Sequence, residues 1–179
     1  MTNPWVFGYG SLIWNPGFAF LQSEKALLRG AHRSLSIYSH RHRGTPETPG
    51  LVFGLSRGGS CLGVAFEVDA TIWPEVFAYL QEREQDRGVY REAWRKITLA
   101  SGMRVEALTY LVDERHPQFA GDLDVAEQVR LVTSGTGQSG RNIEYVRNTA
   151  QHLLALGIQD AALLEIVDAL DRDATRMGV

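Results

Sequence analysis

The residue best suited to acid–base chemistry in this chain of 179 residues is Glu84. It follows an apolar helical pattern, and at about 100° per residue it lies about 20° from Phe77 and about 40° from Leu80. Glu82 points away from this apolar face. Burial and the nearby helix C-terminus both raise the pKa of such a carboxyl group, which suits a general base. The alternative is a structural ion pair with an arginine, such as Arg87 or Arg91.

A second candidate is a glycine-containing segment near the N-terminus. It consists of Val6, Phe7, Gly8, Tyr9, Gly10, Ser11, Leu12, Ile13 and Trp14. The two glycines that flank Tyr9 allow unusual backbone dihedrals and close approach of a ligand, so that successive N–H groups could hold a carboxylate or an oxyanion. A β-bulge whose aromatic side chains fill the core explains the segment equally well.

Other patterns favour no cofactor and no metal. The pattern G-x-G-x-x-G at 135–140 follows a predicted helix where a dinucleotide site requires a strand, which indicates a turn between helices. The five histidines lack the spacing of metal ligands. The lone cysteine, Cys61, lies in an apolar strand and is predicted to be packed. Ser11 does not stand in the G-x-S-x-G motif of hydrolases.

Composition favours a folded cytoplasmic protein, either a monomer or a weak dimer. Hydrophobic residues make up 44% of the chain and charged residues 22%, and no segment is long and apolar enough to cross a membrane. No secretory signal is visible at the N-terminus. Arginines and histidines crowd residues 29–43, but a net charge of −3 argues against a nucleic-acid partner.

The periodicity predicts a single α+β domain over residues 1–179, with a curved, largely antiparallel sheet. Strands are expected at 5–7, 27–38, 51–55, 61–68, 93–99 and 105–112, with a hairpin turn at 57–60. Helices are expected at 71–88, 124–134, 142–156 and 160–173. The prolines and glycines of residues 42–50 predict a loop.

Several blocks, in order along the chain, resemble the ChaC-type γ-glutamylcyclotransferases. They are Val6–Trp14, His42–Pro46, Pro49-Gly50, Gly63–Phe66, Arg83-Glu84 with Gly88-Val89-Tyr90, and Ser139–Asn142 with Tyr145. The resemblance implies a small mixed, largely antiparallel β-barrel with surrounding helices. It also implies cleavage of glutathione to 5-oxoproline and cysteinylglycine, with Glu84 as the catalytic residue and Val6 to Leu12 as the substrate-binding loop. The polar run 85–87 departs from many relatives.

In this reaction the α-amine of the glutamyl group attacks its own γ-carbonyl. One carboxylate can take the ammonium proton and return it to the departing amine. The hydroxyls of Tyr9, Tyr90 and Tyr145 are candidates to bind the glutamyl carboxylate or the oxyanion, and Arg41, Arg43 or Arg141 could receive the glycyl end. Two alternatives stay open, namely cyclotransfer on another γ-glutamyl amine or dipeptide, and a non-catalytic binding module.

Overall fold

The computed structural model describes residues 2–85 and 88–177. It divides into two compact units, each formed by two separate stretches of the chain. Unit 1 comprises Met1–Ser34 and Gly54–His116, and unit 2 comprises Leu35–Phe53 and Pro117–Val179. The long strands β2 and β3 contribute residues to both units.

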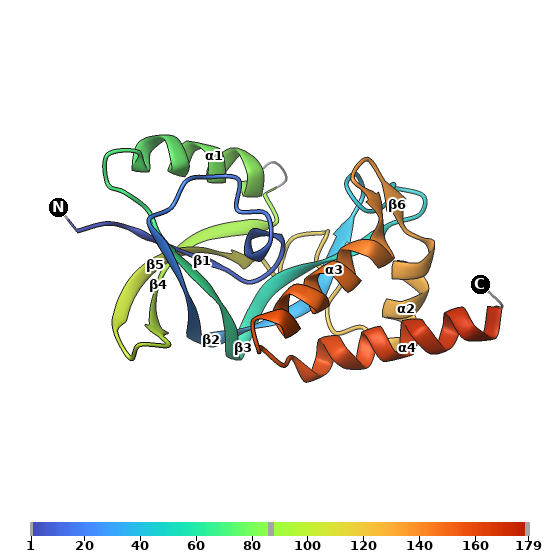
Figure 1. The fold of residues 1–179 in the computed structure, drawn as a ribbon. Coiled ribbons are helices and arrows are strands. Elements are labelled where there is room, and N and C mark those ends of the chain that lie inside the picture. Colours follow the sequence, from blue (N-terminus) through green and yellow to red (C-terminus); the bar gives the residue numbers. More distant parts are fainter. Residues whose placement is uncertain (1, 86–87, 178–179) are drawn as a thin grey trace. The chain divides into compact units, whose positions relative to one another are not determined.

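Five strands form a closed barrel in the order β1-β3-β2-β4-β5 (Figure 1). The strands are β1 (Trp5–Gly8), β2 (Gln22–Ser39), β3 (Gly50–Glu67), β4 (Tyr90–Leu99) and β5 (Arg104–Val112). β1 pairs in parallel with β5 and antiparallel with β3, while β4 pairs antiparallel with both β2 and β5. The predicted mixed, largely antiparallel barrel is therefore confirmed.

The helix α1 (Trp73–Gln85) covers strands β1 and β5 in unit 1 (Figure 1). Its Val76 and Leu80 are buried against Val6, Leu108 and Tyr110. Because apolar residues at i and i+4 lie on one helix face, these two side chains enter the same core. The helix expected at 71–88 is thus confirmed within the described residues.

The hairpin turn predicted at 57–60 is wrong, because β3 continues through these residues. Gly58 and Gly59 have φ values of 91° and 68°, which side-chain-bearing residues rarely adopt. Glycine pairs of this kind occur in bulges as well as in turns, and a bulge lets the strand continue. Residues 57–60 are all exposed, so no buried apolar side chain among them favours a bulge over a hairpin turn.

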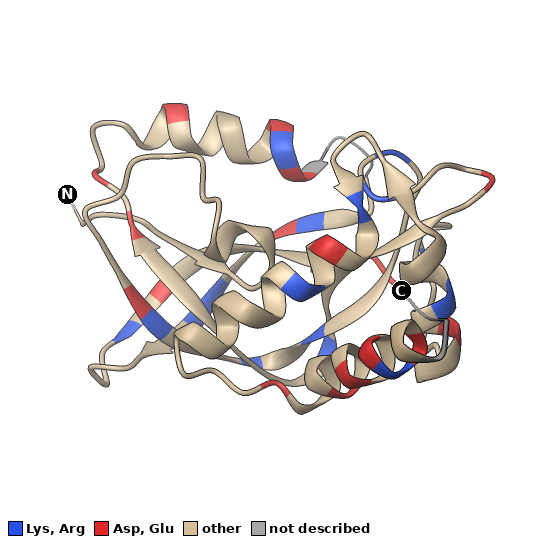
Figure 2. Ribbon diagram, turned by 45° about the vertical axis from the view of Figure 1, so that its right-hand side comes forward, with Lys and Arg blue, Asp and Glu red and all other residues tan. Residues whose placement is uncertain are grey.

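Unit 2 contains three helices that contact one another: α2 (Val125–Ser134), α3 (Asn142–Ala155) and α4 (Ala161–Met177). All three predicted helices of this region are confirmed. Acidic residues predominate on α4 (Figure 2), and its Asp171 accepts a hydrogen bond from Arg147 of α3 at 2.5 Å. Within the described residues, no helix is long and apolar enough to cross a membrane.

The G-x-G-x-x-G pattern forms a small hairpin between α2 and α3. Its strands are β6 (Thr136–Gly137) and β7 (Gly140–Arg141), which pair antiparallel. Gly140 has a φ of 97°, which accounts for glycine at this position. The predicted connection between two helices is confirmed, and the pattern does not follow a strand of a parallel sheet.

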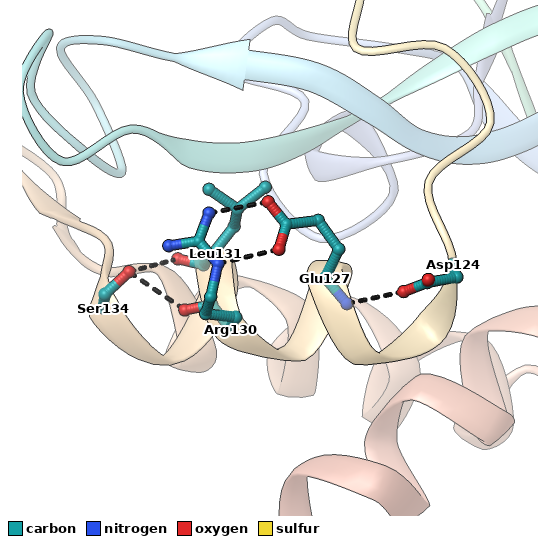
Figure 3. A network of polar contacts seen from close by, with 5 residues as sticks. All are labelled: Asp124, Glu127, Arg130, Leu131 and Ser134. Atoms are coloured by element: carbon teal, nitrogen blue, oxygen red, sulfur yellow. Dashed lines mark hydrogen bonds and ion pairs between the residues drawn. The ribbon is translucent and has the colours of Figure 1, made fainter.

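Side chains at and just before the start of α2 stabilise its first turns (Figure 3). Asp124 precedes the helix, and its carboxylate accepts a hydrogen bond from the Glu127 amide at 2.8 Å. Arg130 donates to both carboxylate oxygens of Glu127, at 2.7 and 2.6 Å. Capping of this kind satisfies an N–H group that has no partner inside the helix, and it explains why α2 begins after Asp124.

A buried asparagine links α3 to β3 inside unit 2. Asn142 is fully buried, and its Nδ2 donates to the Leu51 carbonyl at 2.7 Å. The Leu51 amide donates to Asn142 Oδ1, also at 2.7 Å. One amide side chain therefore pairs both backbone groups of a strand residue, as a neighbouring strand would.

Candidate active site

The glycine-containing loop begins as the buried strand β1 and ends in a short turn. Val6 and Phe7 have no exposed surface, and the Phe7 carbonyl accepts a hydrogen bond from Thr109 Oγ1 at 3.1 Å. Residues Ser11–Ile13 form one turn of 3-10 helix. The first N–H groups of such a turn have no partner inside it, so they are available to a ligand or to other groups.

Two glycines allow this loop to pack closely against its neighbours. A Cβ atom on Gly8 would lie 3.0 Å from the Leu12 Cβ, which is tighter than ordinary contact. A Cβ atom on Gly63 would collide with the Gly8 carbonyl and with the Phe7 ring. Space therefore requires glycine at position 63 and favours it at position 8, and neither residue has a positive φ.

The expectation of unusual glycine dihedrals beside Tyr9 is confirmed at Gly10. Its φ of −132° and ψ of −125° lie outside the α and β regions, although neither Gly10 nor Gly8 is among the glycines with positive φ. Tyr9 itself is 6% exposed, so its ring belongs to the core, as the alternative interpretation of this segment expected. The loop combines a packed aromatic residue with a backbone turn.

A buried arginine holds one side of the loop. Arg33 is 7% exposed, and its Nε donates to the Tyr9 carbonyl at 2.6 Å. Its Nη2 donates to the Leu62 carbonyl at 2.7 Å. One arginine of the basic segment 29–43 thus positions the loop from inside unit 1 and does not belong to a charged surface.

A second arginine joins the loop to α1. Arg83 Nη1 donates to the Asn15 carbonyl at 2.7 Å and to the Pro16 carbonyl at 3.1 Å. Its Nη2 donates to Ser11 Oγ at 3.0 Å, and Nη1 also reaches the Tyr79 hydroxyl at 2.9 Å. The guanidinium group therefore fixes the loop against the last turn of α1.

Glu84 lies beside this arginine, in the charged last turn of α1 (Figure 2). Its side chain is 14% exposed, and Oε1 lies 3.4 Å from Arg83 Nε. Glu82 is exposed, as the helical phase predicts. Burial raises the pKa of the Glu84 carboxyl group above its ordinary value, and the positive charge of Arg83 partly opposes this shift. The site thus holds a carboxyl group that gives up its proton less readily than one in water.

In the alternative interpretation Glu84 forms a structural ion pair, and Arg83 is the partner that the structure provides. Arg91 is engaged elsewhere, because its Nη2 donates to Asp113 at 2.5 Å. Arg87 lies outside the described residues. Since Arg83 makes four hydrogen bonds to other groups, its contact with Glu84 does not by itself identify a purely structural role.

One hydrophobic cluster in unit 1 brings three of the predicted site residues together, namely Val6, Leu12 and Tyr90. Leu12 from the loop and Leu80 from α1 are both buried in it, and Tyr90 at the start of β4 packs against it. Leu80 lies one turn before Glu84 on the same helix face. The loop, the glutamate helix and Tyr90 therefore meet around a common core.

Tyr145 belongs to unit 2 and is described within that unit. Its hydroxyl accepts a hydrogen bond from the Phe53 amide at 3.1 Å, and its ring lies 5.6 Å from the Phe53 ring. The Arg43 guanidinium lies 5.3 Å from the centre of the Tyr145 ring. Arg43 also donates to the Arg141 carbonyl at 3.2 Å, so two of the three proposed glycyl-end arginines are neighbours.

Three structural features around the candidate site were not predicted from the sequence: the contacts of Arg33, those of Arg83, and the buried tyrosine Tyr110. Both arginines act on backbone carbonyls far away in the chain, which no local pattern encodes. Tyr110 lies in a run of four buried residues, 107–110, so its burial does not follow from an alternating pattern, and its neighbours across the core were not predictable either.

Comparisons with known proteins identify the family of the chain. The family model described as ChaC-like protein matches residues 4–173. The glutathione-specific γ-glutamylcyclotransferase of Escherichia coli (strain K12) is 33% identical over 163 residues, covering 91% of this chain and 71% of that protein. The human glutathione-specific γ-glutamylcyclotransferase 1 is 32% identical over 174 residues, covering 93% of this chain and 78% of that protein.

The fold has a counterpart among solved structures. The crystal structure of a yeast γ-glutamyl cyclotransferase specific to glutathione superposes with a TM-score of 0.86 at 23% identity, over 96% of this chain and 97% of that one. At this level of identity the superposition supports the fold. The sequence matches go further, since the family model spans nearly the whole chain, and the chain therefore belongs to the ChaC-like family.

Proposed function

We propose that the chain is a glutathione-specific γ-glutamylcyclotransferase, with Glu84 as its general acid and base. The observation that carries the proposal is the position of Arg83, which contacts the Glu84 carboxylate and also holds the glycine-containing loop. The names of the relatives supply the substrate, and the site in unit 1 supplies the groups that the reaction needs.

The reaction rearranges bonds within the substrate. The α-amine nitrogen of the γ-glutamyl group forms a bond to the γ-carbonyl carbon, and the bond from that carbon to the cysteinyl nitrogen breaks. The products are 5-oxoproline and cysteinylglycine, and no water is consumed. The attacking nitrogen begins as an ammonium group and ends as the lactam N–H, so it loses two protons, and the cysteinyl nitrogen gains two as it becomes the ammonium group of cysteinylglycine. No electron transfer occurs, so the reaction as written requires no redox cofactor.

Glu84 performs both proton transfers in this proposal. The substrate ammonium group cannot attack until it loses a proton, and the ionised carboxylate accepts that proton. The raised pKa makes the protonated carboxyl group persist closer to neutral pH, so that it can return the proton to the cysteinyl nitrogen. The same side chain thus acts as base and then as acid, without a second catalytic group.

The loop from Val6 to Leu12 holds the γ-glutamyl group. Its backbone N–H groups at the start of the 3-10 turn are suited to an oxyanion or a carboxylate, because they are donors that need no reorientation. Tyr9, Tyr90 and Tyr145 remain proposed binding residues. Their hydroxyls are candidates for the glutamyl carboxylate, with Tyr90 the one that packs against the same core as Leu12 and Leu80.

We further propose that residues 1–179 act as one domain, as a monomer or weak dimer in the cytoplasm, without nucleic acid or membrane. The family model runs through both units, which supports a single functional domain. Glutathione is part of the reducing system of the cytosol, which supports that compartment. The net charge of −3 supports the absence of a polyanionic partner.

The direct test is to incubate the purified chain with reduced glutathione and to quantify both products by mass spectrometry. We expect 5-oxoproline and cysteinylglycine to appear in equal amounts. γ-Glutamylalanine and a γ-glutamyl amine serve as competing substrates in parallel reactions. Turnover of these compounds without turnover of glutathione would replace the proposed substrate, and the absence of 5-oxoproline in every reaction would overturn the proposal.

A further inference from the structure

The hydroxyl of Tyr110 is a buried polar group whose role the proposed reaction does not yet use. The Tyr110 side chain is 1% exposed. Among the residues that the structure describes, no hydrogen-bond partner reaches its hydroxyl. A buried hydroxyl without a partner lowers the stability of a protein, and groups of this kind require an explanation.

Tyr110 lies against the two elements that carry the proposed site. It packs in the same cluster as Leu12 of the loop and Leu80 of α1. Because Leu80 and Glu84 are four residues apart on α1, their side chains lie one above the other on one helix face. Tyr110 therefore shares a cluster with the residue that lies one helical turn before Glu84.

Two carboxylates act on this hydroxyl. Burial is the main cause that raises the pKa of the Tyr110 phenol. The negative charges of Glu92, which pairs with Tyr110 between β4 and β5, and of Glu84 raise it further. The phenol therefore stays protonated at neutral pH and remains able to donate a hydrogen bond. Glu92 already accepts one from Gln81 Nε2 at 3.3 Å.

Glu84 has room for such a donor. Arg83 Nε lies 3.4 Å from its Oε1, and this contact leaves Oε2 able to accept a hydrogen bond from another donor. The terminal torsion of a glutamate side chain has a broad, shallow energy profile, so a small rotation is enough to turn Oε2 toward a neighbouring donor. Hydrogen bonds of catalytic groups commonly tighten when the site becomes active.

We propose that Tyr110 is a positioning residue that donates a hydrogen bond from its hydroxyl to the ionised carboxylate of Glu84. This inference rests on the proposed function, in which Glu84 moves the proton. With Arg83 at one oxygen and Tyr110 at the other, the carboxylate is held in a fixed plane toward the substrate amine. The hydrogen bond stabilises the ionised form, so it keeps the burial of Glu84 from making the base too weakly ionised to act.

Within the described residues, few other charged or titratable groups lie around Tyr110 and Glu84. Arg83 and Tyr79 come from α1, and Glu92 and Tyr90 come from β4, while the 3-10 turn supplies only the Ser11 hydroxyl. Arg83 favours the ionised form of Glu84, and Glu92 disfavours ionisation of the Tyr110 phenol. Neither group changes when the Tyr110 hydroxyl is removed, so the effect of that removal can be read separately.

The experiment compares the wild-type chain with Y110F, which removes one oxygen and keeps the ring. Protein labelled with ¹³C at the glutamate side-chain carboxyl is titrated by NMR, and the Glu84 signal is assigned by its absence in E84Q. We expect the Glu84 midpoint in Y110F to lie about one pH unit or more above that of the wild type, since a hydrogen bond to a carboxylate is lost. The acid limb of the pH profile of kcat/KM for glutathione moves upward by the same amount.

The control is Y38F, which removes a tyrosine hydroxyl in unit 2 and leaves the Glu84 midpoint unchanged. An unchanged Glu84 midpoint in Y110F, together with a higher melting temperature, would overturn the inference, because it is the result expected for a hydroxyl that never has a partner. The NMR titration needs no turnover. A wild-type chain without activity on glutathione would therefore overturn the proposed function, while the contact between Tyr110 and Glu84 would still be tested.

Discussion

Arg83 Nη2 lies 3.0 Å from Ser11 Oγ, and this contact joins the helix that carries Glu84 to the loop proposed to bind the substrate. The two residues are 72 positions apart in the chain. The same guanidinium group donates to the carbonyls of Asn15 and Pro16. The position of the carboxylate relative to the loop thus depends on one planar group with several donors.

We expect R83K to be folded but less stable and less active. A lysine has one ammonium group and cannot reach Ser11, Asn15 and the Glu84 carboxylate together. The loss of two or three hydrogen bonds is expected to cost about 1–3 kcal/mol in the free energy of unfolding, measured by urea denaturation. A decrease in kcat/KM of about tenfold corresponds to about 1.4 kcal/mol of lost positioning.

The matched control for R83K is R91K. Arg91 is 62% exposed and pairs with Asp113 on the surface, where such pairs contribute about 0–1 kcal/mol. Both variants make the same chemical change, so a difference between them reports the position. Equal stability and activity of R83K and the wild type would show that the loop does not depend on this guanidinium group.

We expect E84Q to lose at least about 100-fold in kcat, because an amide cannot accept the proton of the substrate amine. General acid–base catalysis contributes about 10²- to 10⁴-fold, or about 3–5 kcal/mol. Binding of glutathione, measured by calorimetry, is expected to change much less than kcat. E82Q, with its side chain in solvent, is the control and keeps full activity. A destabilised E84Q with normal activity per folded molecule would assign Glu84 to a structural ion pair.

The raised pKa of Glu84 also predicts how stability depends on pH. Below about pH 4.3 the carboxyl group is protonated in both the folded and the unfolded chain. As the pH rises, the unfolded chain ionises first, because burial keeps the folded group protonated. The wild type therefore becomes less stable relative to E84Q until the pH exceeds the folded pKa.

This pH dependence is measured as the difference in the free energy of unfolding between wild type and E84Q, from pH 4 upward. Using the difference removes the contribution of all other titrating groups that the two proteins share. If the wild type instead became more stable relative to E84Q as the pH rises, the charge of Arg83 would outweigh burial. The pKa of Glu84 would then be lowered in the folded chain.

The close approach of Gly8 and Gly63 predicts an order of effects for two alanine variants. In G63A the new methyl group meets the Gly8 carbonyl and the Phe7 ring, so the backbone of β1 has to move. In G8A the nearest atom is the Leu12 Cβ at 3.0 Å, and a smaller adjustment suffices. We expect G63A to be destabilised by about 1–3 kcal/mol, and G8A by less.

Activity provides a second measurement for these variants. Both displace the loop relative to Glu84, so we expect kcat/KM for glutathione to fall in the same order as stability. If G63A retained the kcat/KM of the wild type while unfolding more easily, the loop geometry would matter for folding alone.

Local patterns were sufficient to predict the helices of unit 2 and the helical phase of Glu84. The helix expected at 142–156 is observed as Asn142–Ala155, since apolar spacing at 3.6 residues is a property of the segment itself. The turn at 57–60 was predicted wrongly because two adjacent glycines are compatible with a hairpin and with a bulge. Only the pairing of the whole strand decides between these structures.

The site depended on contacts that no segment contains by itself. The burial of Arg33 follows from carbonyls 24 and 29 positions away, so its place among the arginines and histidines of residues 29–43 gave no indication of it. The relation of Tyr110 to Glu92 follows from the register between β4 and β5. The negative φ of Gly10 could not be read from its neighbours, because glycine permits both signs.

The contact between Asn142 and Leu51 also has a consequence for synthesis on the ribosome. The two residues are 91 positions apart, and translation at about 5–20 residues per second separates them by about 5–18 s. During this interval the nascent β3 has already emerged, while both backbone groups of Leu51 still lack their later partner. In the sequence, the two stretches of unit 2 stand before and after residues 54–116 of unit 1. Unit 2 can therefore be completed only after residues 54–116 have been made. The order of synthesis therefore gives unit 1 the first opportunity to fold.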